Sequence, residues 1–226
     1  MCSRYNLTSP SEAVRSYFRV GPGDPFPPRY NIAPTQPTAI IRLDHNGARE
    51  LALVRWGLIP SWVKDPARLS TLINARAETA AEKPSFRGSM RHRRCLIPAN
   101  GFYEWTGKPR ARQPHLIRRP DGGLIAFAGL WESWLGADGS EIETMAILTV
   151  AANATLEPIH DRMPAILESD AFDAWLDVRG LRAEMAAEML RPAPDCLLEH
   201  ITVDPRINNS RNEGADLIQP YREGLL

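Results

Sequence analysis

Residues 39–56 read AIIRLDHNGARELALVRW, and this stretch decides the fold class. It holds two runs rich in aliphatic residues, Ala39–Leu43 and Leu51–Trp56, each long enough for a β-strand. Between them lies Asp44-His45-Asn46-Gly47, and an Asn-Gly pair favours the tight turn that joins antiparallel strands. The stretch therefore predicts a β-hairpin, which is the first pair of strands in a sheet.

Short apolar segments of the same kind recur along the rest of the chain. Residues 116–117 and 124–131 predict a second hairpin across Asp121-Gly122-Gly123, because paired glycines after an aspartate favour a turn. Further predicted strands are Cys95–Pro98, Gly101–Trp105, Thr144–Ala151 and Leu197–Val203. Strands this short and this numerous favour a curved, mainly antiparallel sheet over a parallel one.

Helical signals are fewer and lie between the predicted strands. Ser9 and Glu12 have the spacing of a capping box, and an apolar face follows in the helix that would continue to about residue 20. Other predicted helices cover residues 169–176 and 181–190, and Asn74 is a possible cap of a short helix that ends near residue 81. Together the elements predict an α+β fold over residues 1–226, a single domain with a barrel-like sheet flanked by a few helices.

Composition narrows the class of protein. Of 226 residues, 43% are hydrophobic and 24% are charged, which is enough for a core and typical of a soluble globular chain. No apolar run approaches the length of a membrane span, and no signal peptide precedes the first charges, so we expect a cytosolic protein without membrane contact. The three cysteines have neither CxxC nor zinc spacing, so we expect no disulfide framework, no metal and no cofactor.

Net charge is zero, but its distribution is uneven. Residues 87–119 carry nine basic side chains against one acid, Glu104, so this segment has a charge of +8 and the remainder −8. A basic face of this kind suits a polyanion such as nucleic acid. The alternative is a solvated surface that is merely rich in arginine.

The chain begins Met1-Cys2-Ser3. A small second residue usually permits removal of the initiator Met, which would leave Cys2 with a free amine beside its thiol. Both groups have ordinary pKa values within about 1.5 units of neutrality, so we expect both to be available for reaction with only modest help from the site. Such a 1,2-aminothiol closes on an aldehyde to form a five-membered thiazolidine. The alternative is that Cys2 lies on a disordered terminus.

Two further side chains are candidates for proton transfer. Glu104 lies between Tyr103 and Trp105, and aromatic surroundings raise the pKa of a carboxyl group into the range of a general acid. Strand alternation, however, directs Glu104 away from both aromatics, so a surface glutamate on an edge strand is an equal alternative. His160 begins a His-Asp-Arg sequence and is either an acid–base residue or a structural histidine.

Eight stretches, taken in order, resemble the SOS-response-associated peptidase (SRAP) family. They are Met1-Cys2 with Arg4, Arg29–Pro34, Trp56–Trp62, Asn74–Thr79, Arg94–Trp105, Phe127–Trp131, His160–Leu167 and Asn208–Ile218. Two departures stand out. Ser3 occupies a position where the family usually has glycine, and Val63 stands where some members carry a second tryptophan.

The resemblance implies a sensor of abasic sites in single-stranded DNA. Cys2, freed of Met1, would attack the open aldehyde of the deoxyribose and form a thiazolidine crosslink that shields the lesion. Glu104 and His160 would transfer protons, and Asn74 would position the terminal amine or the sugar. Phosphates would be held by Arg4, Arg76 and Arg162, and Trp62 would stack on or wedge against the DNA.

Two other functions remain open at this stage. In a cysteine peptidase or N-terminal-nucleophile hydrolase, Cys2 would be the nucleophile and His160 the base, with removal of Met1 as a limited form of the activity. A non-enzymatic reader of modified DNA would bind without any adduct. We rank crosslinking by a monomer first, because it alone explains a cysteine at position 2.

Overall fold

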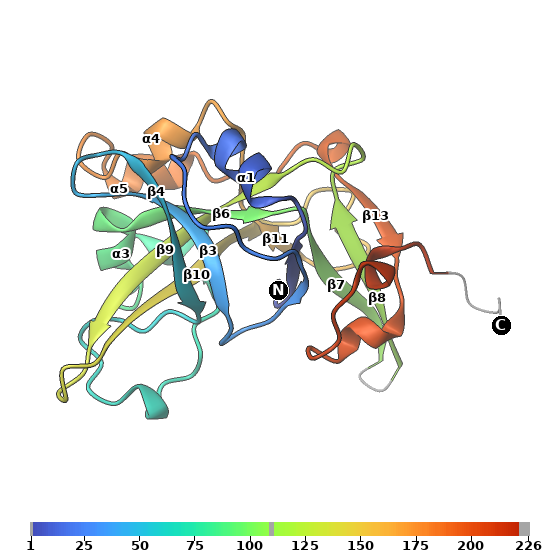
Figure 1. Cartoon of the computed structure of the whole chain (residues 1–226), viewed down its shortest axis with the longest axis horizontal. Helices are drawn as coiled ribbons and strands as arrows, with labels where there is room; N and C mark the ends of the chain where they lie inside the picture. Colours follow the sequence, from blue (N-terminus) through green and yellow to red (C-terminus); the bar gives the residue numbers. More distant parts are fainter. Residues whose placement is uncertain (1, 109–110, 222–226) are drawn as a thin grey trace.

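Five strands close into a barrel that forms the larger part of the molecule (Figure 1). The computed structural model describes residues 2–108 and 111–221. Each barrel strand pairs with the next, and the last returns to the first, in the order β3–β4–β10–β9–β6. The bounds are β3 (Pro37–Leu43), β4 (Arg49–Trp56), β6 (Arg94–Ala99), β9 (Ile125–Leu135) and β10 (Glu141–Ala151).

The hairpin predicted from residues 39–56 is confirmed as β3 and β4. The two strands pair in register from Pro37↔Arg55 to Leu43↔Arg49. Gly47 has a φ of 82°, a left-handed conformation that glycine adopts without steric penalty. The Asn-Gly turn and the two aliphatic runs therefore both favour this hairpin.

A second, five-stranded antiparallel sheet lies beside the barrel in the order β13–β8–β7–β1–β2 (Figure 1). Its strands are β1 (Tyr5–Leu7), β2 (Arg29–Ile32), β7 (Gly101–Lys108), β8 (Ala111–Arg118) and β13 (Glu199–Thr202). The predicted hairpin between residues 116–117 and 124–131 is wrong. One edge of β8 pairs with β7 and the other with β13, so neither edge is left for β9, and the turn near Asp121 carries the chain from one sheet to the other.

The carboxyl end of β10 collects short strands from distant parts of the chain. β5 (Asn74–Arg76) runs parallel to Ile147–Thr149, and β11 (Arg162–Pro164) pairs antiparallel with Thr149–Ala151. The next strand, β12 (Ile166–Leu167), pairs with β9. Residues near positions 75 and 160 are thereby brought to the same end of one strand.

Short helices cover the barrel: α1 (Ser11–Phe18), α2 (Ala77–Ala80), α3 (Arg87–His92), α4 (Phe172–Leu176) and α5 (Ala183–Glu188). Single 3₁₀ turns occur at η1 (Pro66–Arg68), η2 (Asp195–Leu197), η3 (Pro205–Asn208) and η4 (Ala215–Ile218). None of the helices in the described part of the chain is long and apolar enough to cross a membrane.

Both predicted caps are wrong. α1 begins after Pro10 without a side-chain cap, because Ser9 exchanges hydrogen bonds with Asn100 instead. Arg76 occupies the N-cap position of α2, while Asn74 lies within β5. In each case a tertiary partner takes the polar side chain that the local pattern assigned to the helix.

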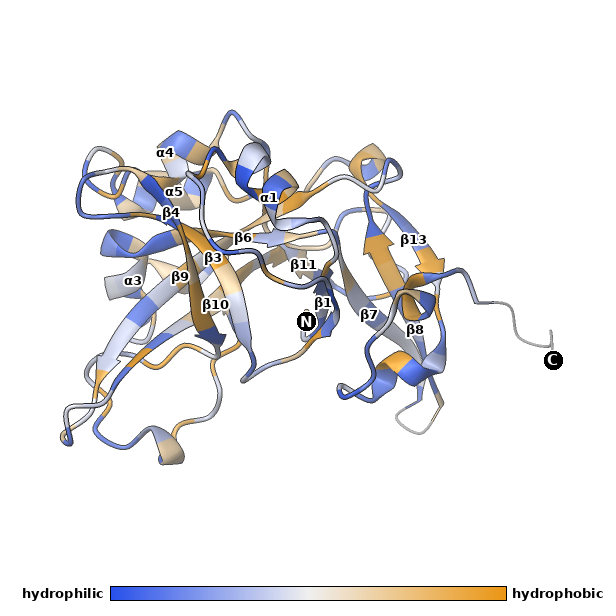
Figure 2. Ribbon diagram, viewed as in Figure 1, coloured by the Kyte–Doolittle hydropathy of each residue, from blue (hydrophilic) through white to orange (hydrophobic). Residues whose placement is uncertain are grey.

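The buried apolar residues form two clusters. Figure 2 shows hydrophobic residues on β3 and β4 of the barrel and on β8 and β13 of the second sheet. The larger cluster fills the barrel and continues under the helices. The smaller one lies on the far face of the second sheet and contains Tyr103, Leu116, Val203, Ile207 and Leu217. The fold is α+β with a closed barrel and few helices, as the sequence predicted.

Candidate functional site

Cys2 lies shortly before β1 and is fully buried. Its backbone carbonyl accepts a hydrogen bond of 2.7 Å from Nδ2 of Asn74, the first residue of β5. β1 is held in turn by β2 and β7, so Cys2 is fixed by pairing on both sides of the strand that follows it. The alternative of a disordered terminus at Cys2 is wrong.

The thiol of Cys2 is held in its neutral form. Burial raises its pKa strongly, and the charge of Glu104 raises it further. Its Sγ atom donates to the carbonyl oxygen of Arg4 at 3.7 Å, a contact that only the protonated thiol can make as donor. In the chain that still carries Met1, the thiol is therefore neutral, and its reaction requires a base that takes the proton.

Glu104 lies inside the second sheet and is 3% exposed. Its strand, β7, is flanked by β1 and β8, so the alternative of a surface glutamate on an edge strand is wrong. Tyr103 and Trp105 pack in the smaller cluster on the opposite face, as strand alternation predicted. Burial raises the pKa of Glu104 from 4.5 to about 7, and the charge of Asp161 adds to the increase.

His160 precedes β11, and its Nδ1 atom accepts a hydrogen bond of 2.9 Å from the backbone N–H of Arg162. Since that nitrogen is an acceptor, the neutral ring carries its proton on Nε2. Burial lowers the pKa of His160, although Oδ1 of Asp161 lies 2.9 Å from Nδ1 and favours protonation. Burial therefore favours the neutral imidazole, and Nδ1 is the ring nitrogen that contacts the backbone of Arg162 and the carboxylate of Asp161.

The four candidates converge from four parts of the chain. Asn74 contacts the backbone of Cys2, the charge of Glu104 acts on the Cys2 thiol, and Asp161 acts on both Glu104 and His160. The side-chain oxygen Oδ1 of Asn74 is buried and has no hydrogen-bond partner within residues 2–108 and 111–221. A buried acceptor left unpaired costs about 1–3 kcal/mol, and such an atom is explained where a ligand completes the bonding.

The three predicted phosphate-binding arginines differ in their surroundings. Arg4 donates to Oδ1 of Asn31 at 2.7 Å and to the carbonyl oxygen of Ile207 at 3.0 Å, and its guanidinium lies 5.9 Å from the ring centre of Trp105. Arg76 is exposed at the end of β5. Arg162 is paired with a carboxylate, Glu78.

Trp62 is 61% exposed and donates from Nε1 to the carbonyl oxygen of Pro84 at 3.4 Å. It borders a hollow that is also lined by Pro84 and, on helix α3, by Arg87, Gly88, Arg91 and His92. The contacts described above for Cys2 involve none of these residues. Trp62 therefore belongs to an exposed surface distinct from the surroundings of Cys2, next to the exposed Arg87 and Arg91.

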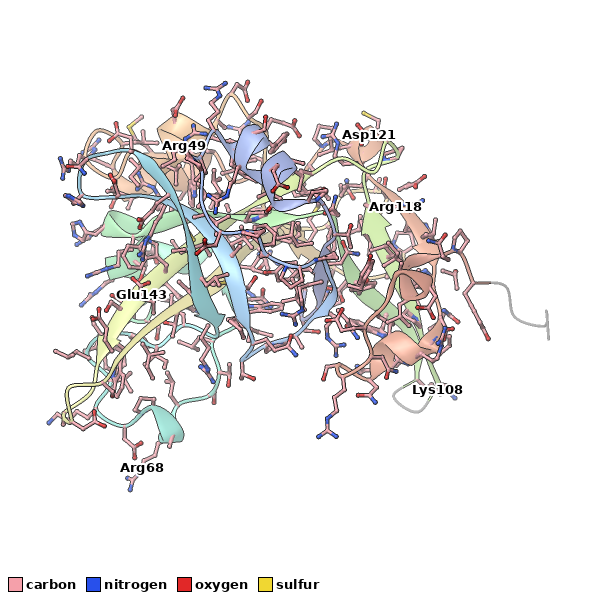
Figure 3. All side chains as sticks on the ribbon, in the orientation of Figure 1. Arg49, Arg68, Lys108, Arg118, Asp121 and Glu143 are labelled. Atoms are coloured by element: carbon pink, nitrogen blue, oxygen red, sulfur yellow. The ribbon has the colours of Figure 1, made fainter. Side chains whose placement is uncertain are left out.

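The basic segment does not form one face. Its first part lies on and after α3 beside the barrel, and its last part lies on the second sheet, where Lys108 and Arg118 mark opposite ends of the β7–β8 hairpin (Figure 3). Arg94 is buried and donates to the carbonyl oxygens of Met90, Trp175, Asp177 and Leu181. Arg110 lies outside the described residues. Charge counted along the sequence therefore overstates the basic surface available to DNA.

Two residues of the site received no role from the sequence. Glu78 lies inside the Asn74–Thr79 motif. Its position two residues after Arg76 was the one local feature that could have indicated a role. Asp161 follows His160, but its influence on Glu104 depends on the packing of β11 against β10. No group of three or more His, Cys, Asp or Glu side chains within the described residues is arranged to hold a metal ion.

A closed barrel joined to a second sheet, with a buried cysteine, a buried carboxyl group and a partly exposed imidazole beside β1, defines a class of protein with a candidate cysteine site. The chain belongs to the SOS response associated peptidase (SRAP) family, whose model matches residues 1–210. The family resemblance inferred from the motifs is thereby confirmed.

Similar proteins cover most of the chain. The abasic site processing protein YoqW of Bacillus subtilis is 37% identical over 225 residues, which include 98% of this chain and 100% of YoqW. The abasic site processing protein HMCES of Xenopus tropicalis is 33% identical and is covered over 67% of its length, with 86% of this chain aligned.

Solved structures show the same fold. A protein from Bacteroides thetaiotaomicron superposes with a TM-score of 0.85 at 26% identity, covering 98% of this chain and 100% of that one. A protein from Bordetella bronchiseptica gives a TM-score of 0.77 at 30% identity, covering 90% of this chain and 100% of the other.

Proposed function

We propose that this protein captures abasic sites in single-stranded DNA as a covalent thiazolidine formed by Cys2 after removal of Met1. Similar proteins bear the name abasic site processing protein, which supports the class of substrate. The observation that carries the proposal is the convergence on Cys2: Asn74 holds its backbone carbonyl, and Glu104, with a pKa of about 7, acts on its buried thiol.

The chemistry needs a group that both gives and takes a proton, and a pKa near the working pH suits that task. Protonated Glu104 donates to the ring oxygen of the deoxyribose hemiacetal while a base removes the proton of the C1′ hydroxyl, and the aldehyde opens. The Cys2 amine adds to the aldehyde carbon and one water leaves, giving an imine. The thiol then adds across the C=N bond: sulfur bonds to C1′ and the thiol proton passes to nitrogen. The net change is the loss of one water.

The other site residues have roles that fit their surroundings. The ionised form of Glu104 accepts the thiol proton, which the raised pKa of Cys2 requires before sulfur attacks. His160, whose pKa is lowered by burial, exchanges a proton with a sugar hydroxyl. Asn74 holds Cys2 in place with Nδ2 and keeps Oδ1 available to the incoming amine or sugar.

DNA contacts extend this proposal. Arg4, Arg76 and Arg162 bind phosphates that flank the lesion, and Trp62 offers an exposed ring to a base. Ser3 is compatible with the proposal, because the non-glycine residues with positive φ in the described chain are Arg19 and Thr35. The backbone at position 3 therefore does not require glycine.

The peptidase alternative would use the same cysteine. A thiolate nucleophile needs a base, as in a cysteine–histidine pair. The thiol of Cys2 donates to the carbonyl oxygen of Arg4, so a base would have to take its proton in this reaction as in crosslinking. The names of the similar proteins, abasic site processing proteins, favour crosslinking. Turnover of a peptide in trans that is lost in Cys2→Ser would favour this alternative.

The decisive experiment uses single-stranded DNA treated with uracil glycosylase, followed by a denaturing gel. The wild-type protein is expected to give an SDS-resistant adduct, and Cys2→Ala to give none while still binding the DNA. Cys196→Ala is the matched control, because Cys196 is exposed and lies in η2, and it should react like the wild type. The intact mass establishes whether Met1 has been removed. An SDS-resistant adduct with Cys2→Ala would contradict the thiazolidine.

A further inference from the structure

Glu78 forms an ion pair that occupies the hydrogen-bonding edge of Arg162. Its Oε1 atom accepts from NH1 of Arg162 at 2.6 Å and its Oε2 atom accepts from NH2 at 2.9 Å. This paired geometry is the one in which a guanidinium binds either a carboxylate or a phosphate. Both terminal nitrogens of Arg162 are therefore engaged by Glu78.

Two cations act on the same carboxylate. The hydrogen bonds from Arg162 lower the pKa of Glu78, and the positive charge of Arg76 lowers it further. Arg76 ends β5, whose first residue, Asn74, holds the backbone of Cys2. Glu78 therefore lies where two positive charges meet, beside the strand that fixes the reactive cysteine.

The two partners differ in how firmly they are held. The side chain of Arg162 is 13% exposed, whereas that of Glu78 is 53% exposed. Arg162 is also anchored independently of Glu78, since NH2 donates to the carbonyl oxygen of Thr149 at 2.6 Å. Ion pairs with a solvent-exposed partner contribute little to stability, so Glu78 can turn into water while Arg162 stays in place.

We propose that Glu78 is a resident substitute for a DNA phosphate, which must displace it to reach Arg162. This inference rests on the proposed binding of DNA, and it makes Glu78 a residue that limits affinity. Displacement leaves an unneutralised carboxylate close to the DNA, which offsets the gain from the new contact between Arg162 and the phosphate. Glu78 therefore lowers the affinity for the phosphate backbone of any DNA, so that only DNA that also reacts with Cys2 is held tightly.

The test measures non-covalent binding to single-stranded DNA that carries tetrahydrofuran, an abasic analogue without an aldehyde. Each phosphate contact on a single strand steepens the dependence of log K on log salt by about 0.7. Glu78→Gln is expected to steepen this slope by about 0.7 relative to the wild type. The same slope gives the expected gain in affinity over the wild type, about eightfold at about 0.05 M salt and about threefold at about 0.2 M.

Three further variants make the result specific. Glu184→Gln changes net charge by the same amount on α5, where Glu184 is exposed, and it should bind within about twofold of the wild type. In an Arg162→Gln background, the gain from Glu78→Gln should disappear. Glu78→Ala should repeat the gain, because Thr149 still anchors Arg162. Melting temperatures establish that each variant is folded.

Several outcomes would overturn the inference. Equal or weaker binding by both Glu78 variants would make Glu78 a residue that merely positions Arg162, and an equal gain in Glu184→Gln would reduce the effect to net charge. If the wild type and Glu78→Gln both fail to bind at the lower salt concentration, the proposed function fails together with this inference. If the binding gain appears but no adduct forms on abasic DNA, only the crosslinking chemistry fails.

Discussion

Replacing Glu104 with glutamine should stabilise the protein in a manner that depends on pH. Glu104 is 3% exposed, and burial raises its pKa from 4.5 to about 7. A group with a raised folded-state pKa favours the folded state fully below its unfolded pKa, and this contribution is lost as pH rises through the folded pKa. A glutamine side chain does not titrate, so the wild type should lose stability relative to Glu104→Gln between about pH 5 and pH 8.

The magnitude follows from the two pKa values. The pKa of Glu104 is 4.5 in the unfolded chain and about 7 in the folded one. From these two values, the free energy of unfolding of the wild type should fall by about 2.5 kcal/mol relative to Glu104→Gln between about pH 5 and pH 8. Titrating groups that do not interact with Glu104 are present in both proteins and cancel in the difference. Glutamine is nearly isosteric with glutamate, so the change in volume is small.

Urea unfolding at about pH 5, 6.5 and 8 measures the difference directly. Glu157→Gln is the matched control, because Glu157 is exposed and its difference from the wild type should stay within about 0.5 kcal/mol at every pH. A difference between wild type and Glu104→Gln that does not change with pH would refute the reasoning. In parallel, crosslinking by Glu104→Gln should fall by about 100-fold or more, since general acid–base catalysis contributes about 10²–10⁴.

The remaining predictions concern positioning, stacking and the core. Asn74→Ala, which removes the hydrogen bond to Cys2, should slow crosslinking at saturating DNA by about 10–100-fold with little change in affinity, as measured by single-turnover gels. Trp62→Ala should weaken binding to tetrahydrofuran DNA by about 1–3 kcal/mol without lowering the melting temperature, and unchanged affinity would exclude stacking. Arg94→Met should destabilise the protein by about 3 kcal/mol or more in urea, because four carbonyl oxygens lose their donor; a loss under about 1 kcal/mol would contradict this account.

Local sequence was sufficient for the barrel hairpin and for the apolar faces of the helices. The β3–β4 pair follows from aliphatic runs around Asn46-Gly47, all of which lie within one short stretch of chain. Phe172, Trp175 and Leu176 are buried on one face of α4 as their spacing indicates. The order of the motifs was sufficient for the family, because the matches extend over most of the chain.

Local sequence was not sufficient wherever a polar residue had a choice of partner. Ser9 and Asn74 both fit a helix cap. Ser9 instead forms a hydrogen bond with Asn100, and Asn74 with the carbonyl oxygen of Cys2. The turn at Asp121 fits a hairpin, yet β7 and β13 already occupy both edges of β8. Arg94 belongs to a basic run, yet it is buried among carbonyl oxygens. In each case the competing partner lies far away in sequence.

The site itself divides along the same line. The sequence by itself determined which groups are present: an aminothiol precursor at Cys2, a carboxyl group at Glu104, an imidazole at His160 and an amide at Asn74. Only the tertiary structure decided the pKa values of the three groups that titrate, since burial raises those of Cys2 and Glu104 and lowers that of His160. Residue type fixes an ordinary pKa, but the solvent and charges around the folded group set the actual one, and β1, β5, β7 and β11 meet only when the barrel and the second sheet have formed.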